Sequence, residues 1–124
     1  MISRRGIAMI AALSGLLAVV LAAAGSHVLA EHGTEVQKLW TTALQIHMFH
    51  TVALLGIAAL IQSDSPPLMS WSGIAMVLGM LFFSGSLYLR ASGIVPVPGL
   101  VAPLGGLLLI AAWLVLITAL GRKK

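Results

Sequence analysis

The chain has 124 residues, of which 60% are hydrophobic and 8% charged, with a formal net charge of +4 and no cysteine. A soluble domain carries about 25% charged residues, so this composition excludes a globular protein with a water-exposed surface. The lack of cysteine excludes disulfides, thiolate catalysis and cysteine-based metal sites. A chain of this length has room for one domain.

Charged side chains divide the chain at regular intervals. Uncharged stretches extend between Arg5 and Glu31, between Lys38 and Asp64, between Asp64 and Arg90, and between Arg90 and Arg122. Each is longer than the roughly 20 residues that a transmembrane helix needs, and a backbone in lipid must satisfy its own hydrogen bonds. We therefore predict an all-α integral membrane four-helix bundle, one domain over 1–124, with spans over 6–32, 35–61, 66–91 and 100–120.

Most of the basic residues gather at the two ends of the chain. Arg4 and Arg5 precede the first span, and Arg122, Lys123 and Lys124 follow the last. An even number of spans places both ends on one side of the membrane. Because basic segments stay on the cytoplasmic side, we predict that both termini are cytoplasmic and that the positive charge reflects orientation, not nucleic-acid binding.

The first span, over 6–32, carries small side chains at spacings that alternate between three and four residues. They are Ala8, Ala11, Gly15, Ala18, Ala22 and Gly25. Such a face lets helix backbones approach closely, and we predict that it packs against another helix of the chain or another subunit. A cleaved signal peptide is the alternative for this segment, but the apolar run exceeds the usual core of about 7–15 residues.

A tight turn is predicted between the first and second spans. Gly33 suits the end of the first helix, and Thr34 with Gln37 fits a capping box that opens the second. Trp40 then marks the outer membrane interface.

The second span, over 35–61, contains the polar run QIHMFH at 45–50. On a helical wheel, His47, His50 and Thr51 share one flank, and Thr41, Thr42 and Gln45 occupy another. Lipid cannot satisfy these groups, so we predict protein neighbours on both flanks and a central place for this helix.

A metal site formed by the histidines is not expected. The turn places His27 level with about residue 40, so His50 lies roughly 15 Å deeper, and His47 and His50 lack a third ligand. No metal or other cofactor is therefore predicted. Proton or ion movement is the functional alternative, but all acidic residues are interfacial. We favour interhelical hydrogen bonds, each contributing about 0.6–2 kcal/mol.

The third span, over 66–91, follows a clear break. Pro66 and Pro67 suit the first turn of a helix, with Ser65 as the cap, and Gly93 ends the span. Gly79 belongs to a partial face of small residues that we expect to pack against another helix. An extended loop leads to the fourth span, over 100–120.

Arg90 lies at the outer end of the third span, where its side chain can reach the interface. We predict an interfacial ion pair with Glu31 or Glu35, and lipid phosphate is the alternative partner. A serine-protease site at Ser84 or Ser86 is not supported, because no oxyanion constellation is visible. No catalytic residue is predicted.

Four runs of the sequence resemble one family: GSH at 25–27, WTTALQIHMFH at 40–50, FSGSLYL at 83–89 and PLGG at 103–106. This is the family of small four-span membrane proteins called domain of unknown function 423, or the transmembrane protein 256-like family. The resemblance implies a four-helix membrane fold and, in bacteria, an inner-membrane location, with no established activity. The residues that match the family pattern are His27, Gln45, His50, Ser84, Gly85, Ser86, Tyr88, Pro103, Gly105 and Gly106. The family usually has Gln where His47 stands and an apolar residue where Arg90 stands, which weakens a shared His47–His50 site.

Together these observations predict a non-enzymatic multi-pass protein of the inner membrane. It would act as a structural or accessory part of a membrane complex, or as a homo-oligomer that packs through small-residue faces. Its partners would be the lipid bilayer and other membrane subunits or itself. The alternative is a small transporter or channel with a polar path along the second span. The candidate buried polar residues are His27, Gln45, His47, His50, Ser84, Ser86 and Tyr88.

Overall fold

The computed structural model describes residues 3–122, apart from the side chain of Val28, and this part of the chain contains helices and no strand. Four helical rods are long and apolar enough to cross a membrane. They are α1 (Arg4–Val28), α2 (Thr34–Leu60), a continuous rod made of α3 (Pro67–Met80), the π-helix η1 (Leu81–Gly85) and α4 (Ser86–Ser92), and α5 (Val101–Gly121). The predicted all-α membrane bundle is confirmed.

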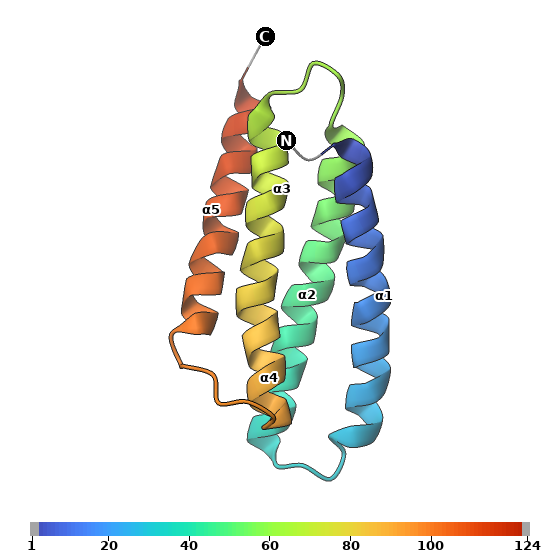
Figure 1. The fold of residues 1–124 in the computed structure, drawn as a ribbon, viewed down its shortest axis with the longest axis vertical. Helices are drawn as coiled ribbons and strands as arrows, with labels where there is room; N and C mark the ends of the chain where they lie inside the picture. Colours follow the sequence, from blue (N-terminus) through green and yellow to red (C-terminus); the bar gives the residue numbers. More distant parts are fainter. Residues whose placement is uncertain (1–2, 123–124) are drawn as a thin grey trace.

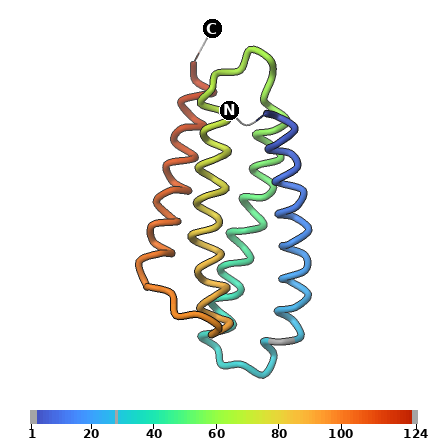
Figure 2. Tube along the Cα trace, in the orientation of Figure 1, coloured from blue at the N-terminus to red at the C-terminus, as the bar shows by residue number. Residues whose placement is uncertain are grey.

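The rods follow one another across the bundle in the order α5, α3–α4, α2 and α1 (Figure 1). The start of α1 and the end of α5 lie at the same end, as the tube in Figure 2 also shows. Arg4, Arg5 and Arg122 therefore share this end, whereas Lys123 and Lys124 lie outside the described residues.

The turn between α1 and α2 differs from the predicted capping box. The N-cap of α2 is Gly33, which has no side chain to accept a bond. Gln37 instead donates its amide to the carbonyl oxygens of Leu29, at 3.0 Å, and His32, at 2.9 Å. It thereby binds two carbonyl oxygens of the turn that follows α1, which ends at Val28, short of the predicted residue 32.

The third rod begins where its prolines require. Pro66 is the N-cap of α3 and Pro67 its first residue. The predicted Ser65 cap is wrong, because the Ser65 hydroxyl accepts a hydrogen bond from the backbone N–H of Gln62 at 2.8 Å. Gly93 ends α4 with φ at +67°, a left-handed conformation that glycine adopts without strain.

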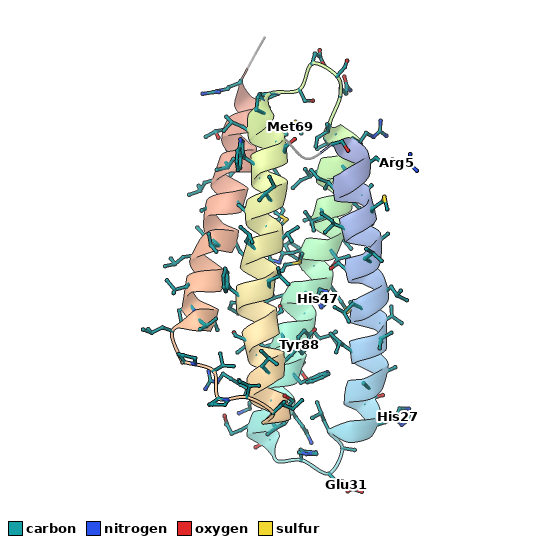
Figure 3. All side chains as sticks on the ribbon, viewed as in Figure 1. Arg5, His27, Glu31, His47, Met69 and Tyr88 are labelled. Atoms are coloured by element: carbon teal, nitrogen blue, oxygen red, sulfur yellow. The ribbon has the colours of Figure 1, made fainter. Side chains whose placement is uncertain are left out.

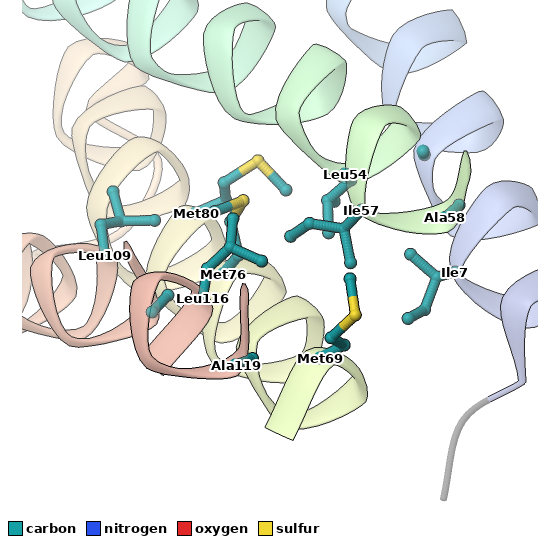
Figure 4. Packing of buried hydrophobic residues seen from close by; sticks show 12 residues of the cluster. Ile7, Leu54, Ile57, Ala58, Met69, Met76, Met80, Leu109, Leu116 and Ala119 are labelled. Atoms are coloured by element: carbon teal, nitrogen blue, oxygen red, sulfur yellow. The ribbon is translucent and has the colours of Figure 1, made fainter. Parts of the chain in front are cut away.

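The hydrophobic core lies toward the end of the bundle where the chain begins and ends. Figure 4 shows Ile7 of α1 and Leu54 and Ile57 of α2 facing α3 and α5, and all of these side chains are buried. Met69 and Met76 of α3 fill the space between them. Methionine suits such irregular gaps because its side chain is unbranched and adaptable.

The small-residue face of α1 packs against α2 of the same chain. Ala11 and Ala18 are buried in it, and a β-carbon at Gly15 would lie 3.5 Å from the Thr51 methyl group. Gly25 lies under the Trp40 indole, and a β-carbon there would collide with the ring. The structure therefore resolves the choice of partner for this face in favour of an internal helix.

Glycines also allow α5 to approach the third rod. A β-carbon at Gly79 would collide with Leu109, and one at Gly105 would collide with the backbone of Phe82 and Phe83. The contact at Gly105 falls on η1, where the helix widens. π-helical turns of this kind are often found at functional sites.

Candidate functional site

A chain of hydrogen-bonded polar side chains crosses the bundle between α1, α2 and α4. His47, near the middle of α2, has Nε2 2.9 Å from Ser14 Oγ on α1 and Nδ1 3.2 Å from the Tyr88 hydroxyl on α4. Ser14 Oγ lies 2.6 Å from Thr51 Oγ1, and Thr51 donates to the His47 carbonyl oxygen at 2.9 Å. Figure 3 shows His47 near the middle of the bundle's length and Tyr88 nearer the end opposite the termini. We call these four residues the His47 cluster.

With a neutral imidazole, only one assignment of protons satisfies every contact in the His47 cluster. The Thr51 proton goes to the carbonyl oxygen, which can only accept. Ser14 must then donate to Thr51, so it accepts from His47 Nε2–H. His47 Nδ1 is left as the acceptor for the Tyr88 hydroxyl. The donors therefore run in one direction and end on a backbone carbonyl.

His50 is held between its own helix and α5. Its Nδ1 lies 2.8 Å from the Ile46 carbonyl oxygen, and the Trp113 indole N–H donates to its Nε2 at 3.2 Å. Because a carbonyl only accepts and an indole N–H only donates, His50 is neutral and carries its proton on Nδ1. His47 carries its proton on Nε2, so the two histidines adopt opposite tautomers and serve different neighbours.

The remaining buried hydroxyls bind backbone carbonyl groups. Ser84 donates to Ala43 of α2 at 2.8 Å, and Ser72 donates to Ala112 of α5 at 2.9 Å. Ser86 donates at 2.9 Å to a carbonyl one turn earlier in its own rod. Among the described residues, no buried side-chain nitrogen or oxygen lacks a hydrogen-bond partner. The polar interior is therefore fully paired without water.

The predicted burial of His27 is wrong. The side chain is exposed at the end of α1 opposite the termini, close to where the helix stops at Val28 (Figure 3). It is not brought near His47 or His50, and no group of three or more His, Cys, Asp or Glu suited to a metal occurs in the part of the chain described here.

Gln45, which was predicted to be buried, is exposed on the surface of the single chain. The flank of α2 that carries Thr41, Thr42 and Gln45 is exposed, whereas the flank that carries His47, His50 and Thr51 is buried. The reason is that α1 and the third rod pack against α2 on the histidine side alone, where Trp113 of α5 also reaches His50. We expected protein neighbours on both flanks of α2. Within this chain, only the flank that carries the histidines has them.

The predicted ion pair of Arg90 with Glu31 or Glu35 is not formed between the described residues. Glu35 instead lies 3.8 Å from the Lys38 ammonium group one turn along α2, and both side chains are exposed. A partner on the same helix is the nearer choice for a carboxylate in the first turn. Arg90 is itself exposed at the end of α4.

Ser14 and Trp113 are among the residues of the polar interior that were missed from the sequence. Ser14 is the first serine inside the first span, and its position beside Gly15 on the small-residue face was the available signal. Trp113 was missed because a tryptophan within an apolar helix is usually read as an interface or core residue. Its pairing with His50 depends on how α5 lies against α2, which periodicity does not reveal.

A cleft opens beside the His47 cluster, between α1 and the third rod. Its volume is about 260 Å³, and its walls include Leu13, Leu17, Met80 and Leu81. Ser14, His47 and Tyr88 also border it, but their polar atoms are occupied with one another. The cleft is therefore an apolar groove over a satisfied polar base.

Comparison with known proteins shows which family the chain is similar to. The family described as "Protein of unknown function (DUF423)" matches residues 21–106. The chain belongs to this family. It is 36% identical to the UPF0382 inner membrane protein YgdD of Escherichia coli (strain K12) over 92% of the chain and 88% of the relative. It is also 36% identical to a UPF0382 membrane protein of Staphylococcus epidermidis over 87% of the chain and 88% of the relative.

Membership of the DUF423 family confirms the resemblance seen in the sequence and, with the four membrane-crossing helices, a multi-pass location in the inner membrane. No solved structure matches the chain significantly. The family match includes Gly25, Gln45, the His47 cluster apart from Ser14, and η1. It ends at Gly106, just after the glycine that contacts η1.

Proposed function

We propose that this DUF423 protein is a non-enzymatic structural or accessory component of the inner membrane, which acts by associating with other membrane protein chains. We further propose that both termini are cytoplasmic. Arg4, Arg5 and Arg122 at one end of the bundle support this orientation, because basic residues near helix ends stay on the cytoplasmic side.

The observation that carries the proposal is the closed hydrogen bonding of the interior. The donors of the His47 cluster end on the His47 carbonyl oxygen, which accepts a hydrogen bond but does not pass a proton on. Both nitrogens of His50 are likewise occupied. These side chains hold α1, α2, α4 and α5 together, and among the described residues they leave no buried side-chain nitrogen or oxygen free for a substrate.

Proton flux tests the proposal directly. The purified protein would be placed in liposomes that contain a pH-sensitive dye, and a potassium gradient with valinomycin would drive proton entry. We expect the rate of protein-free liposomes, for the natural protein and for His47→Gln alike. Proton entry above that rate, lost in His47→Gln, would overturn the proposal.

A small carrier is the second candidate, and one observation favours it. The cleft of about 260 Å³ reaches from the apolar surface of the bundle to His47. A carrier of this kind needs the cluster to open and admit a proton or ligand. The flux measurement separates the two candidates, because only the carrier predicts His47-dependent movement.

A further inference from the structure

The exposed flank of α2 carries a polar group at a depth where lipid surrounds the helix. Gln45 is exposed and lies roughly 7.5 Å deeper than Trp40 at about 1.5 Å of rise per residue. Trp40 itself packs over Gly25 of α1 at the level expected for the membrane interface. The Gln45 side chain forms no hydrogen bond with any residue that the structure describes.

An amide in this position is costly unless another molecule pairs with it. A backbone or side-chain amide left unsatisfied in hydrocarbon costs several kcal/mol. The other exposed faces differ from this one: that of α1 presents Leu13, Leu16 and Val20, and that of α5 presents large apolar side chains suited to lipid. The flank of α2 is therefore the face of the described chain that calls for a protein partner.

We propose that Gln45 lies at the centre of a homodimer interface in which α2 packs against α2 of a second copy. This inference rests on the proposed role in association and names the partner. Two copies with the same membrane orientation place their α2 helices parallel, about a two-fold axis along the membrane normal. Gln45 then faces Gln45 of the second copy.

The chemistry of the side chain selects a second copy. A primary amide is both donor and acceptor, so two glutamines across a two-fold axis satisfy each other with reciprocal N–H to C=O bonds. Glutamine side chains are known to bond across membrane helices in this way. A single polar residue at a core position of a helix pair also determines its register.

The spacing along the flank supports the same geometry. Exposed residues follow Gln45 at alternating intervals of three and four, at Met48, Val52, Leu55 and Ala59. This is the seam of a parallel, left-handed helix pair. Beside it lies Gly56, where a β-carbon would meet nothing within 4 Å. A small exposed residue allows the two backbones to approach.

The charged residues of α2 do not oppose this arrangement. Lys38 lies on the same seam, so the two copies would bring their Lys38 side chains toward each other. Lys38 lies about two helical turns on the water side of Gln45, and its Nζ is 3.8 Å from Glu35 Oε1 of its own chain. Water and this neighbouring carboxylate screen the repulsion.

Cysteine cross-linking in native membranes tests the interface, since the chain contains no other cysteine. Met48→Cys and Val52→Cys place a thiol on the seam, and Leu16→Cys places one on the exposed face of α1. Leu16 is the matched control because it is 64% exposed, as Val52 is at 68%. We expect copper-phenanthroline to produce a disulfide-linked dimer with the α2 cysteines and not with Leu16→Cys. Equal cross-linking from both faces would overturn the proposal.

The role of the amide is tested by Gln45→Leu and Gln45→Asn in the Val52→Cys background. Removing the amide should weaken dimerisation about three- to twenty-fold, whereas Asn should retain most of it. Because Gln45 is exposed, circular dichroism should show an unchanged fold. Undiminished cross-linking in Gln45→Leu would overturn the interface, as would association of α2 with a different protein in place of a second copy. The proposed function is overturned by His47-dependent proton flux, which is measured separately from cross-linking. Failure of this inference is therefore distinguishable from failure of the proposed function.

Discussion

The bond between Trp113 and His50 allows a quantitative test of how the polar interior stabilises the bundle. The Trp113 indole N–H donates to His50 Nε2 at 3.2 Å and thereby joins α5 to α2. His50 is 5% exposed and Trp113 is half-buried on a helix surrounded by lipid, so neither partner can turn to water. The perturbation is a double-mutant cycle made of His50→Leu, Trp113→Phe and the double variant.

The structure gives the expected magnitudes. His50→Leu leaves the indole N–H without an acceptor in an apolar environment, which costs about 1–3 kcal/mol of unfolding free energy. Trp113→Phe leaves a nitrogen lone pair unpaired and also removes packing. The double variant leaves neither group unpaired. We therefore expect it to be less destabilised than the sum of the single variants, by about 0.6–1.7 kcal/mol.

Unfolding in mixed micelles with increasing SDS, followed by far-ultraviolet circular dichroism, measures these free energies without relying on tryptophan fluorescence. The control is Trp71→Phe, which removes an indole from a side chain that is 59% exposed on α3. Combined with His50→Leu, it should be additive within about 0.5 kcal/mol. Additivity of His50→Leu with Trp113→Phe to the same degree would refute the bond as a stabilising contact.

Three further predictions test other parts of the interior by the same measurement. Gly105→Ala should destabilise the bundle by about 1–3 kcal/mol, because a β-carbon collides with the backbone of η1. The control is Gly106→Ala, whose β-carbon has room, and it should be neutral or stabilising. Equal losses of unfolding free energy in the two variants would contradict the close contact at Gly105. Tyr88→Phe should cost about 0.5–1.5 kcal/mol, since it removes the donor to His47 Nδ1, and no change would show that this bond does not stabilise the bundle. Arg90→Glu should change the free energy of unfolding by less than about 0.5 kcal/mol. A larger loss would indicate that Arg90 does form an ion pair.

The architecture could be predicted from the sequence because it depends on quantities that the sequence displays directly. Charged residues occur at intervals of one membrane thickness, and lipid permits helices as the spanning structure. The close approach of α1 to another helix was also predicted, from Gly15, Gly25 and the alanines between them. The identity of the partner was not, because a small-residue face allows a close contact without specifying which helix makes it.

The candidate site was predicted less completely. The wheel separated the flank of His47 from the flank of Gln45, but helical periodicity assigns residues to faces and does not say which face a neighbour covers. The widened turn at η1 was not foreseen, since a constant period of about 3.6 residues was assumed throughout the third span. That turn influences which residues after Gly85 face α2, and Tyr88 is one of them.

The buried histidines also explain why Gln45 faces outward. At about 100° per residue, Gln45 lies roughly 160° around α2 from His47 and roughly 140° from His50. Turning Gln45 into the bundle would require α2 to rotate by nearly half a turn. That rotation would break the bonds of His47 to Ser14 and Tyr88 and leave the Trp113 indole without its acceptor. The interior contacts within one chain therefore determine which flank of α2 is left for a second chain.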